Sequence, residues 1–224
     1  MAISLTKTDA EKSIVIDLLK RLQLEVVIIV DRSGSMNKTD VEILSQGIFG
    51  FGKKPQLITR YQASTDFVKS IIEQILIHDP KPDLGTFSEN NSSTYFTDCA
   101  IGSQEHRNFL ATQPGGGTYL IPCLNKAWTA HNLRGSKSLV FVVLDGDCHD
   151  LSELKGWLKD TAQKLETPDE FHLIFVKIGE ENLGNFFQEI ENLEGAKHDI
   201  VSFYSLKQIQ EEGIGKHLQK IFGK

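Results

Sequence analysis

The sequence lacks long apolar runs, and their absence limits the classes of protein to which it can belong. No stretch approaches the roughly 20 consecutive apolar residues that cross a bilayer. The opening residues, MAISLTKTDAEKS, contain no apolar segment like the core of a signal peptide. We therefore expect a cytoplasmic protein without a membrane segment.

Basic residues and cysteines are also scarce. The chain has 24 lysines and arginines against 30 aspartates and glutamates, which gives a formal net charge of -6, and neither sign forms a long run. This balance predicts no nucleic-acid-binding surface, so the expected partners are proteins or small ligands. The three cysteines, Cys99, Cys123 and Cys148, are odd in number and far apart, which fits neither a disulfide framework nor a CxxC pair.

Apolar runs without alternation are the strongest structural signal that is present. A chain of 224 residues with 40% hydrophobic content is typical of one soluble domain. Strands buried on both faces read as continuous apolar runs, and such strands belong to mainly parallel sheets. The sequence predicts strands of this kind at residues 24–30, 139–144 and 172–178, with weaker ones at 84–88 and 199–204.

Helical patterns alternate with these predicted strands. Apolar residues at helical spacing follow Ser64, a candidate N-cap, as well as Thr118 and Asp150, and a further apolar stripe begins at Leu183. A capping box is expected between Asp150 and Glu153. A leading helix is predicted at residues 9–22 and a closing helix at 206–222. The alternation predicts a doubly wound α/β fold of the Rossmann-like kind, with a mainly parallel sheet and helices on both faces. We expect residues 1–22 to pack on a domain formed by residues 23–224.

Polar oxygen ligands follow the predicted strands directly. In doubly wound folds, ligands bind beyond the carboxyl ends of the strands, where the strand order reverses. Asp31, Ser33 and Ser35 follow the first strand in VIIVDRSGSM, and Asp145 follows the strand at 139–144. Between them, QPGGGTYLIP places Thr118 behind three glycines, which allow a tight loop. Two carboxylates and three hydroxyls form an all-oxygen set suited to Mg²⁺ or Mn²⁺.

These residues resemble the metal-ion-dependent adhesion site of von Willebrand factor A (vWA) domains. That pattern is Asp-x-Ser-x-Ser, then a threonine, then an aspartate, and DRSGSM, GGGT and LDGD match all five positions. The segments ISLTK and NFFQEIENLEGAKHDIVSFYSL further resemble the A domains of bacterial tellurium and toxic-anion resistance proteins. The sequence departs from the vWA pattern at residues 38–62, which are inserted before the first helix expected after the serines.

The resemblance implies a protein-binding module rather than an enzyme, with a role in intracellular assembly or in the response to toxic anions. Asp31, Ser33, Ser35, Thr118 and Asp145 would hold the ion directly or through water. Five protein groups leave at least one of the six oxygen positions around Mg²⁺ to water. A Glu or Asp of a protein partner could replace that water.

Other interpretations of the same segments remain open. DRSGSMNKTDVE has the ligand spacing of a calcium EF-hand loop, but Met36 stands where a glycine is needed and a strand precedes it. GIFGFGKK, residues 47–54, is one substitution from a phosphate-binding loop, so a Mg²⁺-dependent phosphohydrolase or NTPase is the alternative function. Lys54 and Pro55 oppose it, because Lys54 cannot supply a metal-binding hydroxyl and Pro55 removes one N–H donor. A third possibility is a structural module whose site has lost its metal.

Overall fold

The computed structural model describes residues 9–46, 53–75, 79, 81–89, 93–146, 148–179, 186–191 and 193–223. Several segments used in the sequence analysis lie outside these ranges. They are ISLTK, GIFGFG at 47–52, Asp147 of LDGD, and Leu183.

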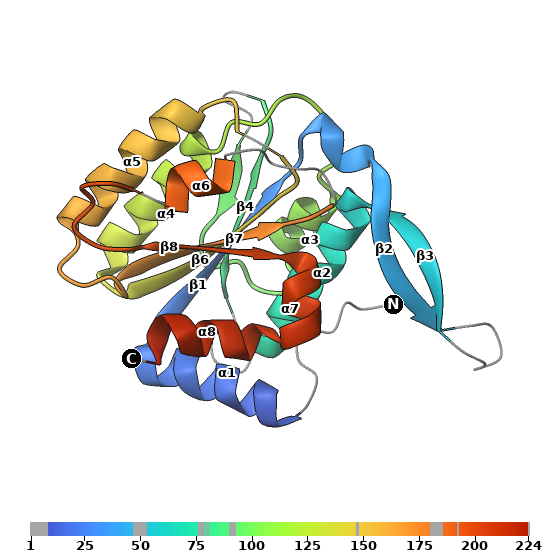
Figure 1. Cartoon of the computed structure of the whole chain (residues 1–224), viewed down its shortest axis with the longest axis horizontal. Coiled ribbons are helices and arrows are strands. Elements are labelled where there is room, and N and C mark those ends of the chain that lie inside the picture. The colour runs from blue at the N-terminus through green and yellow to red at the C-terminus, as the bar shows by residue number, and fades with distance from the viewer. Residues whose placement is uncertain are drawn as a thin grey trace.

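A six-stranded sheet forms the centre of the molecule (Figure 1). Its strand order is β5-β4-β1-β6-β7-β8, and every neighbouring pair is parallel except β4 and β5. The strands are β1 (Leu24–Asp31), β4 (Asp83–Phe87), β5 (Thr94–Phe96), β6 (Lys137–Leu144), β7 (Phe171–Lys177) and β8 (Val201–Ser205). The predicted doubly wound α/β fold is confirmed.

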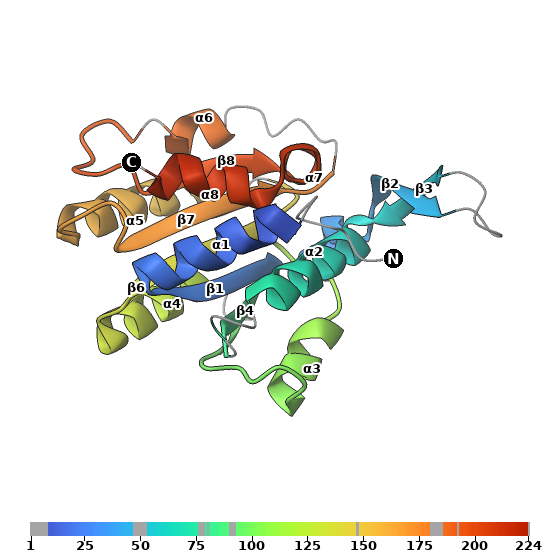
Figure 2. The same ribbon diagram turned by 90° about the horizontal axis from the view of Figure 1, so that it is seen from below.

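Helices cover both faces of this sheet (Figures 1 and 2). One core includes side chains of α1 (Asp9–Leu22), α2 (Arg60–Ile75), α3 (Gln104–Ala111), α7 (Leu206–Glu212) and α8 (Ile214–Phe222). The other includes side chains of α4 (Ile121–Arg134), α5 (Leu151–Lys164) and α6 (Phe186–Glu191). In β1, Val26, Ile28 and Val30 belong to the first core and Val27 and Ile29 to the second. Because side chains alternate across a strand, only a continuous apolar run can supply both cores.

The inserted segment forms a β-hairpin that projects from the body of the molecule (Figures 1 and 2). Strands β2 (Thr39–Gln46) and β3 (Lys53–Thr59) pair antiparallel in a sheet of their own. The hairpin leaves and rejoins the body at one point, because Thr39 pairs with Thr59 and the Arg60 amide donates to the Lys38 carbonyl at 2.9 Å. The inserted segment therefore has regular structure on both sides of residues 47–52.

The predicted start of one helix and the predicted continuity of the closing helix are wrong. Helix α2 begins at Arg60, ahead of the expected cap Ser64, whose hydroxyl instead donates to the Tyr61 carbonyl inside the helix at 2.8 Å. The closing helix is divided into α7 and α8 at Gly213, whose φ of 84° ends a right-handed helix. A search of the described residues finds no helix long and apolar enough to span a membrane.

Candidate metal centre

The site lies at the carboxyl ends of β1 and β6, which are neighbours in the sheet. Val30 pairs with Val143, so Asp31 at the end of β1 lies beside the chain that leaves β6 at Asp145. From β1 the chain continues through α2 on one face, and from β6 it continues through α5 on the other. The two strands therefore flank a topological switch point, the expected position of a ligand site in this fold.

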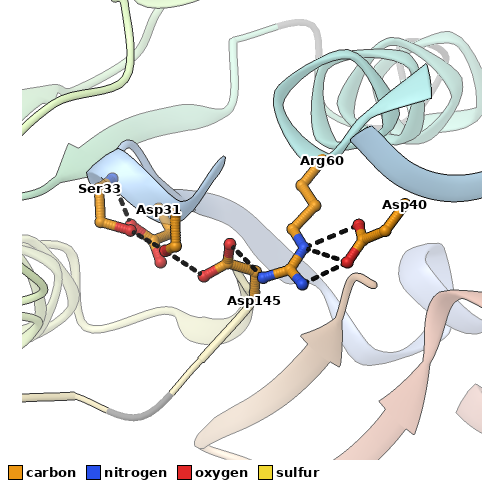
Figure 3. Close-up of polar contacts among 6 residues, drawn as sticks. Asp31, Ser33, Asp40, Arg60 and Asp145 are labelled. Carbon is orange, nitrogen blue, oxygen red and sulfur yellow. Dashed lines mark hydrogen bonds and ion pairs between the residues drawn. The ribbon is translucent and has the colours of Figure 1, made fainter. Parts of the chain in front are cut away.

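Four of the five predicted ligands form one hydrogen-bonded group (Figure 3). Asp31 Oδ1 accepts from the Ser33 amide at 2.6 Å, which fixes the turn that leads into a 3-10 helix at Gly34–Asn37. The hydroxyl oxygens of Ser33 and Ser35 lie 2.9 Å apart. Ser35 Oγ donates to Asp145 Oδ1 at 2.8 Å. The first loop is thereby joined directly to the loop that follows β6.

The glycine-rich loop lies against the first loop through backbone contacts. The Gly34 amide donates to the Gly116 carbonyl at 3.1 Å, and the Gly115 amide donates to the Arg32 carbonyl at 2.7 Å. Gly116 has a φ of 76°, and a Cβ atom there would lie 2.1 Å from Glu89 Cγ. The predicted need for a glycine in this loop thus has a conformational and a steric cause.

Thr118, the fifth predicted ligand, is held by His149. The Thr118 amide donates to His149 Nδ1 at 2.9 Å, and the His149 amide donates to the Thr118 carbonyl at 2.8 Å. The His149 ring also stacks on Tyr119, with 5.2 Å between ring centroids. Among the residues that the structure describes, none of the aspartates or serines forms a hydrogen bond with the Thr118 hydroxyl. The Thr118 backbone is therefore fixed by His149, whose contacts could not be read from the sequence.

The two predicted carboxylate ligands are both buried. Asp31 is 0% exposed and Asp145 is 1% exposed. Burial, and then the nearby Asp145 carboxylate, raise the pKa of Asp31 to about 7. Asp31 Oδ2 has no hydrogen-bond partner within the described part of the chain. A buried oxygen left in this way costs free energy, and a cation beside it would remove that cost. The all-oxygen residues present thus fit a hard divalent ion.

Arg60 enters the site although nothing in the sequence analysis pointed to it. Its Nη1 donates to Asp145 Oδ2 at 2.9 Å, and its Nε donates to Asp40 Oδ1 at 2.9 Å and Oδ2 at 3.0 Å. Nη2 forms an ion pair with the same Asp40 carboxylate. These hydrogen bonds hold the pKa of Asp40 below its usual value. Figure 3 shows the guanidinium between Asp145 and Asp40.

Arg32, the residue between Asp31 and Ser33, points away from this group. Its Nη1 donates to Ser64 Oγ at 2.8 Å, and its guanidinium carbon lies 4.7 Å from the centre of the Tyr61 ring. Burial lowers the pKa of Arg32 to about 10. The side chain thus anchors the first loop to helix α2.

Asp150 has a different role from the one expected. It precedes α5, but its side chain makes no cap there. Its carboxylate accepts instead from the Leu120 amide at 3.1 Å and the Ile121 amide at 2.8 Å. Asp150 therefore caps the start of α4, because the loop after β6 passes beside that helix end.

The segment considered for phosphate binding does not run into a helix. Lys53 and Lys54 are the first residues of strand β3, whereas a phosphate-binding loop needs the free N–H groups of a helix start. In the described ranges no group of three or more histidine, cysteine, aspartate or glutamate residues could hold a metal. The predicted site differs in composition, since three of its five ligands are hydroxyls.

Comparison with known proteins identifies no function. No family model matches the sequence, and no curated protein matches it. The fold search returns an uncharacterized membrane spanning protein from Vibrio fischeri, with 14% sequence identity, a TM-score of 0.33, and coverage of 88% of this chain and 98% of that chain. A likeness this weak carries no argument, so the function must be argued from the site itself.

Proposed function

We propose that the chain is a metal-dependent protein-binding module of the vWA kind. Asp31, Ser33, Ser35, Thr118 and Asp145 would hold Mg²⁺ or Mn²⁺. The observation that supports this most is the buried, unpartnered Asp31 Oδ2 beside a second carboxylate and two hydroxyls at a switch point. The site would work in the cytoplasm, in the toxic-anion response that the resemblance implies.

The five proposed ligands comprise two charged carboxylates and three neutral hydroxyls. Asp31 and Asp145 together balance the charge of a divalent ion, while the serine and threonine hydroxyls add none. A bound Mg²⁺ or Mn²⁺ would offer its remaining coordination position to a carboxylate from a partner. The neutral hydroxyls favour this step, because they leave more positive field at that position than a third aspartate would.

The exposure of the loops suits the approach of a partner. Asp31 and Asp145 are buried, Ser35 is half-buried, and Gly34, Gly115 and Gly116 are exposed. A Glu or Asp side chain of another protein would therefore approach over the glycines, at the rim of the site. Loops presented by a rigid sheet in this way are common recognition surfaces.

The phosphohydrolase or NTPase alternative gains no support from the geometry. It requires a phosphate cradle followed by a helix, and the chain after residue 52 continues as strand β3. The acidic pair could still be tested for this activity by adding ATP and Mg²⁺ to purified protein and measuring phosphate release. We expect no release above the buffer.

Titration calorimetry with MgCl₂ and MnCl₂ tests the proposal. The unaltered protein should bind one ion, and Asp31→Ala should bind none, because it loses a carboxylate that neutralises the ion. Asp160→Ala is the matched control, since Asp160 is an exposed aspartate on α5, and it should bind normally. Equal metal affinity in Asp31→Ala and Asp160→Ala would refute the assignment.

A pull-down from cell lysate tests the protein-binding part. A partner should be retained with Mg²⁺, lost with EDTA and regained when Mg²⁺ is restored. Retention that is equal with and without EDTA would contradict metal-dependent capture.

A further inference from the structure

The guanidinium of Arg60 forms an ion pair with Asp145, a carboxylate that the proposed metal site needs. We propose that Arg60 is a tethered competitor of the divalent ion: its guanidinium and the ion compete for Asp145, and the guanidinium moves fully onto Asp40 when the ion enters. This inference rests on the proposed metal-binding function. It assigns to the inserted hairpin a role in setting metal affinity.

Asp145 is fully engaged in the structure. Its Oδ1 accepts from Ser35 Oγ at 2.8 Å, and its Oδ2 accepts from Arg60 Nη1 at 2.9 Å. The Arg60 and Asp145 side chains are each 1% exposed. A divalent ion beside the same carboxylate would face the guanidinium across a short distance with little water between them. Like charges repel strongly in such a setting, so the ion and the Asp145–Arg60 pair oppose each other.

The Arg60 side chain is closely surrounded by neighbouring segments. Arg60 begins α2 at the point where the hairpin rejoins the body, and its amide donates a hydrogen bond to the Lys38 carbonyl at 2.9 Å. On the other side lies Gly179, just after β7, where a Cβ atom would be 2.6 Å from Arg60 Nε. Arg60 is too buried to meet a partner directly. Its charge therefore acts within the site.

Asp40 is a second carboxylate partner for the Arg60 guanidinium. It already accepts from Arg60 Nε at 2.9 and 3.0 Å and pairs with Nη2. If the bond to Asp145 is broken, the guanidinium keeps a carboxylate partner, so no buried charge is left unpaired. Asp145 Oδ2 then becomes available to the ion. Asp40 belongs to β2 and Arg60 follows β3, so displacement of the hairpin base alters this exchange.

A double-mutant cycle on metal affinity tests the inference. Calorimetric titration with MgCl₂ should show at least tenfold tighter binding in Arg60→Gln, because the competitor is gone. Asp40→Asn should bind the ion several-fold more weakly than the unaltered protein, because the guanidinium then depends on Asp145. In the Arg60→Gln background, Asp40→Asn should change the metal affinity little further, since Asp40 influences the ion through Arg60.

A further variant serves as a control. Arg134 forms a comparable pair with Asp83, at 2.7 and 2.9 Å, at the start of β4 and thus at the opposite end of the sheet. Arg134→Gln should leave metal affinity unchanged. Asp40→Asn, at a side chain that is 33% exposed, covers the case in which Arg60→Gln does not fold, and thermal melting of each variant establishes folding.

The possible outcomes distinguish a failure of the proposed competition from a failure of the proposed metal-binding function. Equal affinity in the unaltered protein and Arg60→Gln, with binding still abolished by Asp31→Ala, would overturn the competition and leave the metal site intact. An equally large effect of Asp40→Asn in both backgrounds would also overturn it, because Asp40 would then act directly on the ion. Binding in Arg60→Gln alone would support it in its strongest form. No binding in any variant would overturn both proposals.

Discussion

Burial shifts the pKa of two residues in opposite directions. The pKa of Asp31 is raised to about 7, and the pKa of His172, buried in β7, is lowered to about 4. In both cases loss of water penalises the charged form. His172 Nε2 lies 3.0 Å from Ser202 Oγ, a neutral partner. The histidine is therefore held neutral between β7 and β8.

His172 should make the stability of the protein depend on pH. Its folded pKa, about 4, lies below the usual histidine pKa of 6.5, so the unfolded state binds more protons between these values. The contribution of His172 to the free energy of unfolding should fall by about 2 to 3 kcal/mol as the pH drops from 7 to 4.5. Urea unfolding of the unaltered protein and of His172→Gln at both pH values measures this.

The comparison isolates the histidine. The Asp31 carboxyl, with its raised pKa, has the opposite effect on stability, but it is present in both proteins and cancels in the difference. His172→Gln should therefore lose less stability on acidification than the unaltered protein. An identical loss in both would show that His172 is not the group responsible.

Gly85 in β4 controls how closely helix α4 approaches the sheet. A Cβ atom at this position would lie 2.6 Å from Cys123 Sγ and 3.1 Å from Tyr95 Cδ2. Gly85→Ala should therefore destabilise the protein by about 1 to 3 kcal/mol, the usual cost of overpacking. Urea unfolding measures the loss.

Cys123→Ala provides the matching test. This change removes the sulfur atom in the way, so Gly85→Ala should cost less in the Cys123→Ala background than alone. Equal costs in the two backgrounds would mean that the sulfur is not the obstacle.

At the scale of elements, the start of α4 is fastened by a residue of another segment. The carboxylate of Asp150 accepts two backbone amides there, at 3.1 and 2.8 Å. Pro122 in the first turn removes one amide that would otherwise need a partner. The contact also ties the loop after β6 to the glycine-rich loop that carries Thr118. One side chain thereby supports a helix and orders the candidate site.

Asp150→Ala should destabilise the protein by about 0.5 to 2 kcal/mol, the range for loss of a helix cap. Glu153→Ala is the control, because Glu153 is exposed in the first turn of α5 and the capping box expected there is absent from this described helix. It should change the free energy of unfolding by less than about 0.5 kcal/mol. If Glu153→Ala cost as much as Asp150→Ala, the sequence-based assignment of the cap to α5 would be correct after all.

The sequence predicts those elements whose side chains enter the core. The run LEVVIIV contains both core faces of β1, and helix α1 coincides with the predicted residues 9–22. Helix α3 was missed because QEHRNFLA buries Phe109 alone. Strand β5 was missed because it has three residues. Such elements depend on their neighbours in space, which local periodicity does not record.

The candidate site likewise contains residues that the sequence predicts and a residue that it does not. Asp31, Ser33, Ser35 and Asp145 were placed together because strand ends of a parallel sheet share an edge. Arg60 was missed because its position depends on where the hairpin closes, a property of pairing between Thr39 and Thr59. The sequence signals the ends of buried strands well and the path of an insertion poorly.

At the scale of the whole molecule, the candidate site joins loops from distant parts of the chain. Backbone hydrogen bonds link the first loop to the glycine-rich loop, and that loop to His149. An ion held there would bind the folded state and not the unfolded chain. Metal binding should therefore stabilise the entire fold.

Thermal unfolding with increasing MgCl₂ measures this linkage. At a free ion concentration 100 times Kd, stability should rise by about 2.7 kcal/mol, which corresponds to a Tm increase of about 5 to 10 °C for a chain of this size. Asp31→Ala should show no increase. A rise of the same size in Asp31→Ala would indicate that the salt acts elsewhere on the protein.

The pairing of α1 with α8 has a consequence for synthesis on the ribosome. The two helices lie side by side (Figures 1 and 2), and Arg21 Nη2 donates to the Phe222 carbonyl at 3.2 Å. Leu19 of α1 and Leu218 of α8 are buried in the same core. About 190 residues separate the two helices, so at roughly 5 to 20 residues per second α1 emerges about 10 to 40 seconds before its neighbour. Throughout that interval the apolar face of the first helix lacks its final cover, which makes the nascent chain a candidate client for a ribosome-associated chaperone.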